Sequence, residues 1–417
     1  MKKKIIIIGA GTIGLHCAYF LNKNGHEVEI IEAASESDTS GCSHGNCGLI
    51  VPSHFVPLAS PGMLKSGMKL IFDAKSPVSL PVLKNIGNIP WFLKFIKAAS
   101  QEHVRRSAPA LYSLNAESKK LYSEIHSQNP EKLEWQEKGL LMTSTTSKGF
   151  EEEIEIAKIA NDLGIETKIL DVGGLKNIQP EVKFNVSGAV WYECDAHIHP
   201  AKYLQWLKKE LKSKGVKFHY QTRLINLKTK KGKIVKAETD TASFTAEEFV
   251  LAAGIYSKEL AKNLGFSLPL ISGKGYSIDF TDTNLKLNIP VILTEAKVAL
   301  TPFVNSLRLG SGMEFNGRTG QINMRRVQEM LDRTHDALPD FPKFEACKLK
   351  IWEGLRPVTP DGIPLIGRTK QIENLLVAAG HAMMGVSLAP ITGKIISDFV
   401  EGKSDDFFSD FLSPNRF

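Results

Sequence analysis

The chain has 417 residues, of which 42% are apolar and 23% carry a formal charge. This composition is that of a globular protein and excludes fibrous and intrinsically disordered classes. The length favours two or three domains over a single hydrophobic core. The net charge of +7 comes from Lys and Arg scattered along the sequence, so it does not indicate a nucleic-acid partner and suits anionic small molecules instead.

The N-terminal region predicts a nucleotide-binding unit. Residues 4–8 form an aliphatic run of the kind that a strand covered on both faces needs, and Gly9 ends it. A helix is predicted next, stopping near the Asn-Gly pair 24–25. The buried strand 28–31 follows and ends at Glu32, whose carboxylate is placed to accept hydrogen bonds from a ribose diol. This order of strand, glycine turn, helix and strand is that of a βαβ unit.

Three glycines in the turn have the spacing GxGxxG. Gly9 permits the tight turn, Gly11 lets a pyrophosphate approach the backbone, and Gly14 lets the helix pack closely on the strand. The start of the helix, at Thr12 and Ile13, offers backbone N–H groups and a positive dipole end to phosphates. The motif therefore predicts a bound dinucleotide, without distinguishing FAD from NAD.

The segment 80–99 mixes aromatic and aliphatic residues with lysines. It is interpreted either as an amphipathic helix that packs on the body of the protein or as a membrane-surface contact. No apolar stretch reaches the roughly 18 residues of a transmembrane helix, and the N-terminal isoleucine run is short for a signal peptide. Five cysteines without a CxxC pair favour a reducing compartment. The predicted location is the cytoplasm, with peripheral contact to the inner face of the cell membrane as the alternative.

The rest of the chain alternates between two sequence patterns. A helix over 200–214, a strand over 216–220 and the apolar run 249–254 continue the nucleotide-binding pattern, whereas 134–146 and 270–314 are typical of antiparallel strands. The predicted fold class is α/β, with a Rossmann-type domain interleaved with an antiparallel-sheet α+β substrate-binding domain. The expected ranges are 1–83, 199–265 and 346–417 for the first domain, and 84–198 and 266–345 for the second.

Two C-terminal segments carry the most specific resemblance to known proteins. Residues 354–367, GLRPVTPDGIPLIG, and 379–390, AGHAMMGVSLAP, resemble the C-terminal signatures of the D-amino-acid oxidase and glycine oxidase superfamily, whose members are FAD enzymes. Four earlier segments are similar, in the same order, to the bacterial D-amino-acid dehydrogenases of the small-subunit type: residues 43–50, 57–62, 274–277 and 299–315. The resemblance covers nearly the whole chain and implies that the dinucleotide is FAD.

The resemblance assigns three groups of residues to FAD. Those beside the isoalloxazine are Ser43, His44, Gly45, Asn46, Cys47 and Gly48. Those near the pyrophosphate are Ala252, Ala253 and Gly254, and those at the pyrimidine end are Gly380, Met384, Gly385, Val386 and Ser387. A helix beginning near Met384 would also aim its dipole at N1 and C2=O of the ring, where reduced flavin gathers negative charge.

Four residues are candidates for the substrate site. Arg356 is the leading one, because its planar guanidinium matches a carboxylate with two parallel hydrogen bonds and the resemblance gives its counterpart that role. Tyr276 either donates a hydrogen bond to the substrate or packs in a strand. His54 and His381 either line the cavity or are structural.

Two positions depart from the resemblance. Met383 stands where glycine oxidase-like sequences carry a second arginine, so carboxylate binding rests on Arg356 alone or recruits another group. Cys47 replaces a more usual alanine, and filling space is its favoured role. A metal site built from Cys42, His44 and Cys47 is not predicted, because a second ligand pair is lacking.

The resemblance implies FAD-dependent dehydrogenation of a small amino or imino acid, with a D-amino acid favoured and a hydride passing from Cα to the flavin. The expected partners are that substrate and an electron acceptor such as a quinone or another carrier. The alternatives within the class are a hydroxyproline or proline-type enzyme and a glycine or sarcosine oxidoreductase. From other classes, an NAD(P)H-dependent flavin monooxygenase and a non-catalytic electron-relay subunit remain open.

Overall fold

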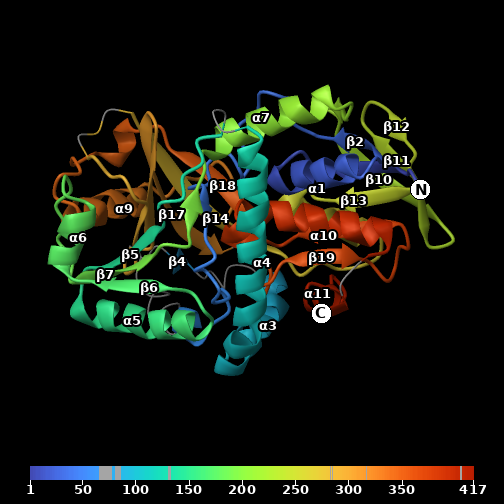
Figure 1. Cartoon of the computed structure of the whole chain (residues 1–417). Helices are drawn as coiled ribbons and strands as arrows, with labels where there is room; N and C mark the ends of the chain where they lie inside the picture. Colours follow the sequence, from blue (N-terminus) through green and yellow to red (C-terminus); the bar gives the residue numbers. More distant parts are fainter. Residues whose placement is uncertain are drawn as a thin grey trace.

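The computed structural model describes residues 1–64, 78–79, 86–129, 133–281, 283, 285–315, 317–403 and 406–417. Two sheets organise the molecule, and Figure 1 shows them on either side of the long helix α4, Gln101–Ser127, which is drawn in cyan. In that view the six-stranded sheet and its helices lie on the right and the nine-stranded sheet lies on the left.

The six-stranded sheet confirms the predicted nucleotide-binding unit. Its order is β19-β20-β13-β1-β2-β9, and all pairs are parallel except the antiparallel pair of β19 with β20. The strands are β1 Lys4–Ile8, β2 Glu27–Ile31, β9 Lys217–His219, β13 Glu248–Leu251, β19 Leu365–Arg368 and β20 Leu375–Ala379. The aliphatic run of β1 is buried from its second residue onward because helices cover one face, and the three-stranded sheet β10-β11-β12 and a further helix cover the other.

The nine-stranded sheet contains the segments that the sequence predicted as antiparallel. Its order is β18-β14-β17-β16-β15-β5-β7-β6, with β4 paired to β17. The strands are β4 Val78–Ser79, β5 Leu140–Ser144, β6 Thr167–Leu170, β7 Gly188–Tyr192, β14 Ile271–Phe280, β15 Val291–Leu293, β16 Val298–Phe303, β17 Ser306–Phe315 and β18 Trp352–Val358. The sheet is not wholly antiparallel, because β15 pairs with β5 and β17 with β4 in parallel. Strand β18 forms its edge, although it lies in the range 346–417 expected for the nucleotide-binding domain.

Helices and small strands fill the remaining positions. The helices are α1 Thr12–Lys23, α3 Ile89–Ala98, α5 Ser147–Asp162, α6 Val172–Ile178, α7 Pro200–Ser213, α8 Ser257–Asn263, α9 Met324–Ala337, α10 Ala389–Glu401 and α11 Asp406–Phe411. Short 3-10 turns are η2 Ile86–Asn88, η3 Gly254–Tyr256, η4 Ala346–Lys348 and η5 Ala382–Gly385. The small strands are β3 Leu49–Ile50, β8 Ala196–His197, β10 Leu224–Lys230, β11 Lys233–Thr239 and β12 Ser243–Phe244.

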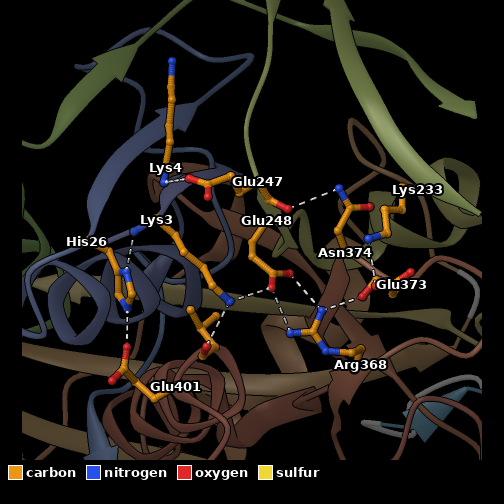
Figure 2. A network of polar contacts seen from close by, with 11 residues as sticks. Lys3, Lys4, His26, Lys233, Glu247, Glu248, Arg368, Glu373, Asn374 and Glu401 are labelled. Carbon is orange, nitrogen blue, oxygen red and sulfur yellow. Dashed lines mark hydrogen bonds and ion pairs between the residues drawn. The ribbon is translucent and has the colours of Figure 1, made fainter. Parts of the chain in front are cut away.

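A polar network closes the end of the six-stranded sheet that lies away from the glycine turn. Figure 2 shows Glu248 receiving hydrogen bonds from Arg368, at 2.8 and 3.1 Å, and from Lys3, at 3.2 Å. On the other side of Lys3, His26 bridges its backbone N–H to the carboxylate of Glu401. The start of β1, strands β13 and β19 and the end of α10 are therefore joined by side chains from four distant parts of the sequence.

Candidate active site

The glycine turn after β1 has the geometry that its sequence predicts. A Cβ atom on Gly9, whose φ is +108°, would lie 2.6 Å from the carbonyl oxygen of Ala252 in the neighbouring strand. A Cβ atom on Gly14 would lie 1.9 Å from the carbonyl oxygen of Gly9, so only glycine lets helix and turn approach this closely. At Gly11 the nearest neighbour would be Oγ of Ser43, 3.9 Å away. The backbone is therefore crowded at Gly9 but leaves free space beside Gly11, where a pyrophosphate fits.

The two ends of a dinucleotide cradle flank this turn. Helix α1 begins at Thr12 after the uncapped Gly11 and has no acidic residue in its first turn, so its positive dipole end favours an anion. The N–H of Thr12 itself donates to Oγ of Ser43, at 3.2 Å. The carboxylate of Glu32 accepts hydrogen bonds from the backbone N–H groups of Ala10, at 2.6 Å, and Ala34, at 2.9 Å. These bonds hold Glu32 beside the turn, where its predicted role toward a ribose remains a prediction.

The residues after β13 lie against the same turn. Besides the carbonyl of Ala252, the Cα of Ala253 would lie 3.2 Å from a Cβ on Gly9, and Gly254 opens a 3-10 turn with φ +57°. Just beyond, Ser257 is fully buried, and its Oγ has no hydrogen-bond partner within the described part of the chain. An unsatisfied buried hydroxyl beside an open cradle is an observation that fits a polar ligand held there.

The loop 43–48 is fastened to the nine-stranded sheet by Arg308. Its Nη1 donates to the carbonyl oxygens of His44, at 2.8 Å, and Asn46, at 2.7 Å, while Nε and Nη2 bind both carboxylate oxygens of Asp279. The side chain of Arg308 is 5% exposed. Sequence analysis gave this residue no role, although a charged residue between two leucines in a strand is a signal that it binds something inside the molecule.

The same loop packs tightly on the sheet. Sγ of Cys47 lies 2.3 Å from where a Cβ on Gly310 would stand, and the indole of Trp352 lies 2.1 Å from a Cβ position on Gly45. Burial raises the pKa of the Cys47 thiol, and also that of Cys42, against the opposing effect of nearby arginine charges. Both thiols are therefore protonated and packed near neutral pH, which supports a space-filling role for Cys47.

Arg356 lies in β18 at the edge of this sheet. Its guanidinium lies across the backbone of Gly275, since a Cβ there would stand 2.0 Å from Nη1. Nη1 donates a hydrogen bond of 2.6 Å to the carbonyl oxygen of Gly312, in a bulged part of β17 where φ is +91°. The glycines let the guanidinium rest on the sheet, and the bond to Gly312 fixes its orientation.

One face of the sheet carries both Arg356 and the loop 43–48. Gly275 and Ser277 point to the same face because side chains alternate along a strand, and Ser277 pairs with Gly310, on which Cys47 packs. The predicted carboxylate-binding residue and the predicted isoalloxazine loop are thus brought together.

Tyr276 points to the opposite face. Its hydroxyl donates to Oε1 of Glu314, at 2.7 Å, and accepts the N–H of Asn323, at 3.1 Å. With Arg326 of α9 it lines a small cavity behind the sheet. The structure therefore does not bring Tyr276 together with Arg356, and its contacts are those of the packing alternative.

The segment 380–387 crosses from the end of β20 towards α10. Gly380 has φ +79°, and its Cβ would lie 2.6 Å from Cγ2 of Thr359. His381 is 4% exposed, its Nε2 shares a hydrogen bond of 2.9 Å with Thr392, and burial lowers its pKa to about 3. The helix expected near Met384 begins at Ala389 instead, because a 3-10 turn, Ala382–Gly385, and three linking residues precede it. The expected helix start was wrong by five residues.

Helix α4 supports this segment through residues that sequence analysis did not single out. Ser387 donates through Oγ to Oδ1 of Asn115, at 2.8 Å, and its carbonyl accepts from Ser118, at 2.5 Å. The hydroxyl of Tyr122 donates to the carbonyl of Val386, at 2.8 Å. All three donors or acceptors lie on one face of α4 at helical spacing, so one helix fixes the whole turn.

The loop and the turn predicted at the flavin also meet each other. Nδ2 of Asn46 donates to the carbonyl of Met383 at 3.5 Å. The side chain of Met383 is 45% exposed and adds no charge at the position of the expected second arginine.

His54 lies in a buried polar group with Ser53 and Asp195. Nδ1 of His54 shares a hydrogen bond of 3.1 Å with Oγ of Ser53, which in turn lies 2.5 Å from Oδ2 of Asp195. Burial lowers the pKa of His54 to about 4 and raises that of Asp195 to about 7. Ser53 and Asp195 were not predicted as site residues.

The glycine cradle, the interleaved α/β fold and the arginine-bearing sheet define a flavoenzyme architecture. The chain belongs to the family described as DAO, FAD dependent oxidoreductase, which matches residues 4–399. It is therefore an FAD-dependent oxidoreductase, and the residues around Gly9, Gly11 and Ser257 fit that cofactor.

Individual proteins are also similar to this chain over nearly their full length. The chain is 29% identical over 413 residues to a D-amino acid dehydrogenase of Helicobacter pylori, covering 99% of this chain and 98% of that one. It is 28% identical over 421 residues to a D-amino acid dehydrogenase of Vibrio atlanticus, covering 99% and 100%. Among solved structures, glycine oxidase from Geobacillus kaustophilus shares the fold with a TM-score of 0.79 at 22% identity, covering 100% of this chain and 99% of that one.

Proposed function

We propose that this protein dehydrogenates a small amino acid, with a D-amino acid favoured, at the bond between Cα and nitrogen. The observation that carries the proposal is the position of Arg356 on the sheet face that also holds the loop 43–48. Two relatives that align over nearly the full chain are named D-amino acid dehydrogenases, which supports the same class of substrate. FAD, when bound, supplies the acceptor for the hydride that leaves Cα.

The protein's own groups then bind and orient the substrate. Nη1 of Arg356 is fixed by Gly312, so the outer edge of the guanidinium is left to form a bidentate pair with the substrate carboxylate. A carboxylate held in one orientation fixes the direction of the Cα–H bond, which is a proximity effect.

The proposed reaction is tested by adding candidate substrates to the FAD-loaded protein without oxygen and measuring the loss of flavin absorbance near 450 nm. The candidates are D-amino acids, L-amino acids, glycine, sarcosine and both hydroxyproline epimers. Bleaching by D-amino acids, lost in Arg356→Ala, is the expected result. Arg356→Lys keeps the charge without the fork, so it should retain only part of the response. As a control, Arg333→Ala on the exposed side of α9 should bleach as the unchanged protein does.

Each of the other outcomes would support one of the alternative functions. Bleaching by glycine or sarcosine, or by a hydroxyproline epimer, would replace the D-amino acid with that substrate. Bleaching only by NAD(P)H would indicate a monooxygenase, and no bleaching by any compound while dithionite still reduces the flavin would favour an electron-relay subunit.

We also propose that electrons leave to a quinone or another carrier and that α3 contacts the membrane in which a quinone resides. Ile89, Leu93 and Ile96 are 39%, 62% and 55% exposed along one side of the helix, beside Lys94 and Lys97. Apolar side chains flanked by lysines suit an anionic membrane surface. Residues 80–85 of the segment discussed in the sequence lie outside the described residues, and none of the described helices is long and apolar enough to cross a bilayer.

Co-sedimentation with vesicles containing phosphatidylserine tests the membrane contact. The unchanged protein should sediment and Leu93→Asp should not, while the exposed control Ile159→Asp on α5 should behave as the unchanged protein. Equal sedimentation of Leu93→Asp would remove α3 from the proposal.

The two-domain division at the ranges given above is likewise proposed, with β18 as the strand that crosses between them.

A further inference from the structure

His54, Ser53 and Asp195 form a continuous chain of hydrogen bonds in the interior. The backbone N–H of Ser53 donates to Oδ1 of Asp195, at 3.0 Å, while Oγ of Ser53 contacts both Oδ2 of Asp195 and Nδ1 of His54. Asp195 has no exposed surface and Ser53 is 7% exposed. The ring nitrogen Nε2 of His54 has no hydrogen-bond partner among the described residues.

The segment that carries these residues runs directly from the predicted flavin loop. Two residues before Ser53, the N–H of Val51 donates to Oγ of Ser387 in the turn supported by α4. Asp195 stands next to β8, which pairs with β3 immediately after the loop 43–48. The segment of these hydrogen bonds is therefore connected to the turn at Ser387 and to the strand pair β3–β8, which follows the loop 43–48.

A second connection leads from His54 towards Arg356. The charge of Lys297 acts on His54, and the backbone carbonyl of Lys297 accepts the hydroxyl of Ser311. Ser311 precedes Gly312, whose carbonyl holds Arg356. His54 is thus linked to the strand that fixes Arg356 through the charge of Lys297 and the hydrogen bond of Ser311.

We propose that His54, Ser53 and Asp195 form a proton relay that removes the ammonium proton of the amino-acid substrate. The free amine, whose nitrogen lone pair assists hydride departure, is the form that can be oxidised. This inference rests on the proposed function and names the group that receives the proton. His54 is the catalytic residue of the relay, and Ser53 and Asp195 act through it.

The proton moves without placing a charge on the imidazole. Nε2 of His54 takes a proton from the substrate nitrogen, Nδ1–H passes its proton to Oγ of Ser53, and Ser53 passes its own to Oδ2 of Asp195. One N–H bond of the substrate is broken, Asp195 ends protonated, and His54 changes tautomer but stays neutral. The hydride and its two electrons leave Cα separately, to the cofactor.

The electrostatics of the three groups agree with this direction of transfer. Burial, with the charge of Lys297, lowers the pKa of His54 to about 4, so the ring resists becoming charged. Burial raises the pKa of Asp195 to about 7, against hydrogen bonds from Ser53 and Cys194 and the charge of Lys119 of α4. Tyr192 of β7 also faces Asp195. Asp195 is therefore the group able to hold the proton near neutral pH.

The first test reads the histidine tautomer directly and does not depend on turnover. In the FAD-loaded protein with ¹⁵N-labelled histidine, the His54 signal, assigned by its loss in His54→Gln, should show Nδ1–H at pH 8.5 and Nε2–H at pH 5.5. In Asp195→Asn the tautomer should not change with pH. A single tautomer over the whole range, or protonation of both nitrogens between these pH values, would overturn the relay.

The second test uses two variants that each remove one side-chain hydrogen bond to Asp195. Ser53→Ala interrupts the relay and should lower kcat/KM for the amino acid by about 10²-fold, and Asp195→Asn should abolish the loss of activity below pH 7. Cys194→Ala removes the other contact, the thiol 3.4 Å from Oδ1, and should stay within about threefold of the unchanged protein.

The two tests separate the relay from the proposed function. Equal losses in Ser53→Ala and Cys194→Ala would show that the contacts only support the structure, and the relay would be wrong. A pH-dependent tautomer without flavin bleaching by any amino acid would support the hydrogen-bond chain and overturn the proposed function. Flavin bleaching by an amino acid, together with a His54 tautomer that does not change with pH, would support the proposed function and overturn the relay.

Discussion

The guanidinium of Arg308 is held by groups of the protein, and these bonds make it a structural anchor of the loop 43–48. Its bonds to His44, Asn46 and Asp279 join three segments. Arg308→Ala would leave two carbonyl groups of the loop without their charged donor, and such bonds contribute about 1.5–3 kcal/mol each. We expect a loss of about 3 kcal/mol in the free energy of unfolding and weaker FAD retention, measured by urea denaturation and by flavin release on gel filtration.

The control for this arginine is Arg333→Ala, because Arg333 is exposed and pairs with Glu329 one helical turn away. Exposed pairs of this kind contribute about 0.3–0.5 kcal/mol. If the two variants lost equal stability, the buried bonds of Arg308 would not hold the loop.

Gly14 is sensitive to a single methyl group. Since a Cβ would stand 1.9 Å from a backbone oxygen, neither partner can move away without breaking the turn, and Gly14→Ala should cost about 3 kcal/mol or more. Thermal unfolding and bound flavin per chain measure the effect. Gly62→Ala, whose Cβ would meet nothing within 4 Å, should leave both quantities unchanged, and an equally intact Gly14→Ala would contradict the geometry.

At the scale of elements, α4 connects the two sheets and holds the turn at Val386 and Ser387. Tyr122→Phe removes the donor at 2.8 Å to the Val386 carbonyl and leaves that carbonyl only the bond of 3.3 Å from the N–H of Ala389, which costs about 1 kcal/mol. We expect a lower unfolding temperature and a shifted flavin absorption spectrum. Tyr112→Phe on the same helix is the matched control, because none of the described residues is hydrogen-bonded to its hydroxyl; equal spectra in both variants would exclude the contact from the cofactor site.

The sequence was informative where local chemistry decides the structure. The strand, glycine turn and helix around Gly9 and Gly14 were predictable because glycine spacing and apolar runs act within a few residues. Other contacts were not predictable from the sequence, because each depends on which distant segments meet. They are the hydrogen bond of Asn115 to Ser387, the bonds of Arg308 to the loop 43–48, and the bond of Ser53 to Asp195. Tyr276 shows the same limit, since alternation along a strand gives two faces but not which one it shares with Arg356.

The whole molecule buries several neutral histidines, and this sets its response to acid. Burial lowers the pKa of His16, His54 and His197 to about 4 and that of His381 to about 3, from an ordinary 6.5. The unfolded chain therefore binds these protons first, and stability falls as pH drops from about 6.5 towards 4, by about 1.4 kcal/mol per pH unit for each histidine. Asp195, with its pKa raised to about 7, has the opposite sign and offsets one of them.

Thermal unfolding at pH 7.5, 6.5 and 5.5 measures the balance. We expect the unfolding temperature to fall over this range and to fall less steeply in His16→Gln, which lacks one of the titrating groups. An unfolding temperature that is constant or rises towards pH 5.5 would show that these rings are not held neutral in the folded protein.

The central strand β1 forms pairs with β2 and β13, and β13 pairs in turn with β20. During synthesis, β1 leaves the ribosome first, yet its neighbour β13 is made more than 200 residues later and β20 later still. The nascent chain must therefore carry an incomplete sheet with apolar faces until almost all of it has been translated. We expect stable folding, and with it cofactor retention, only in chains that extend past α10.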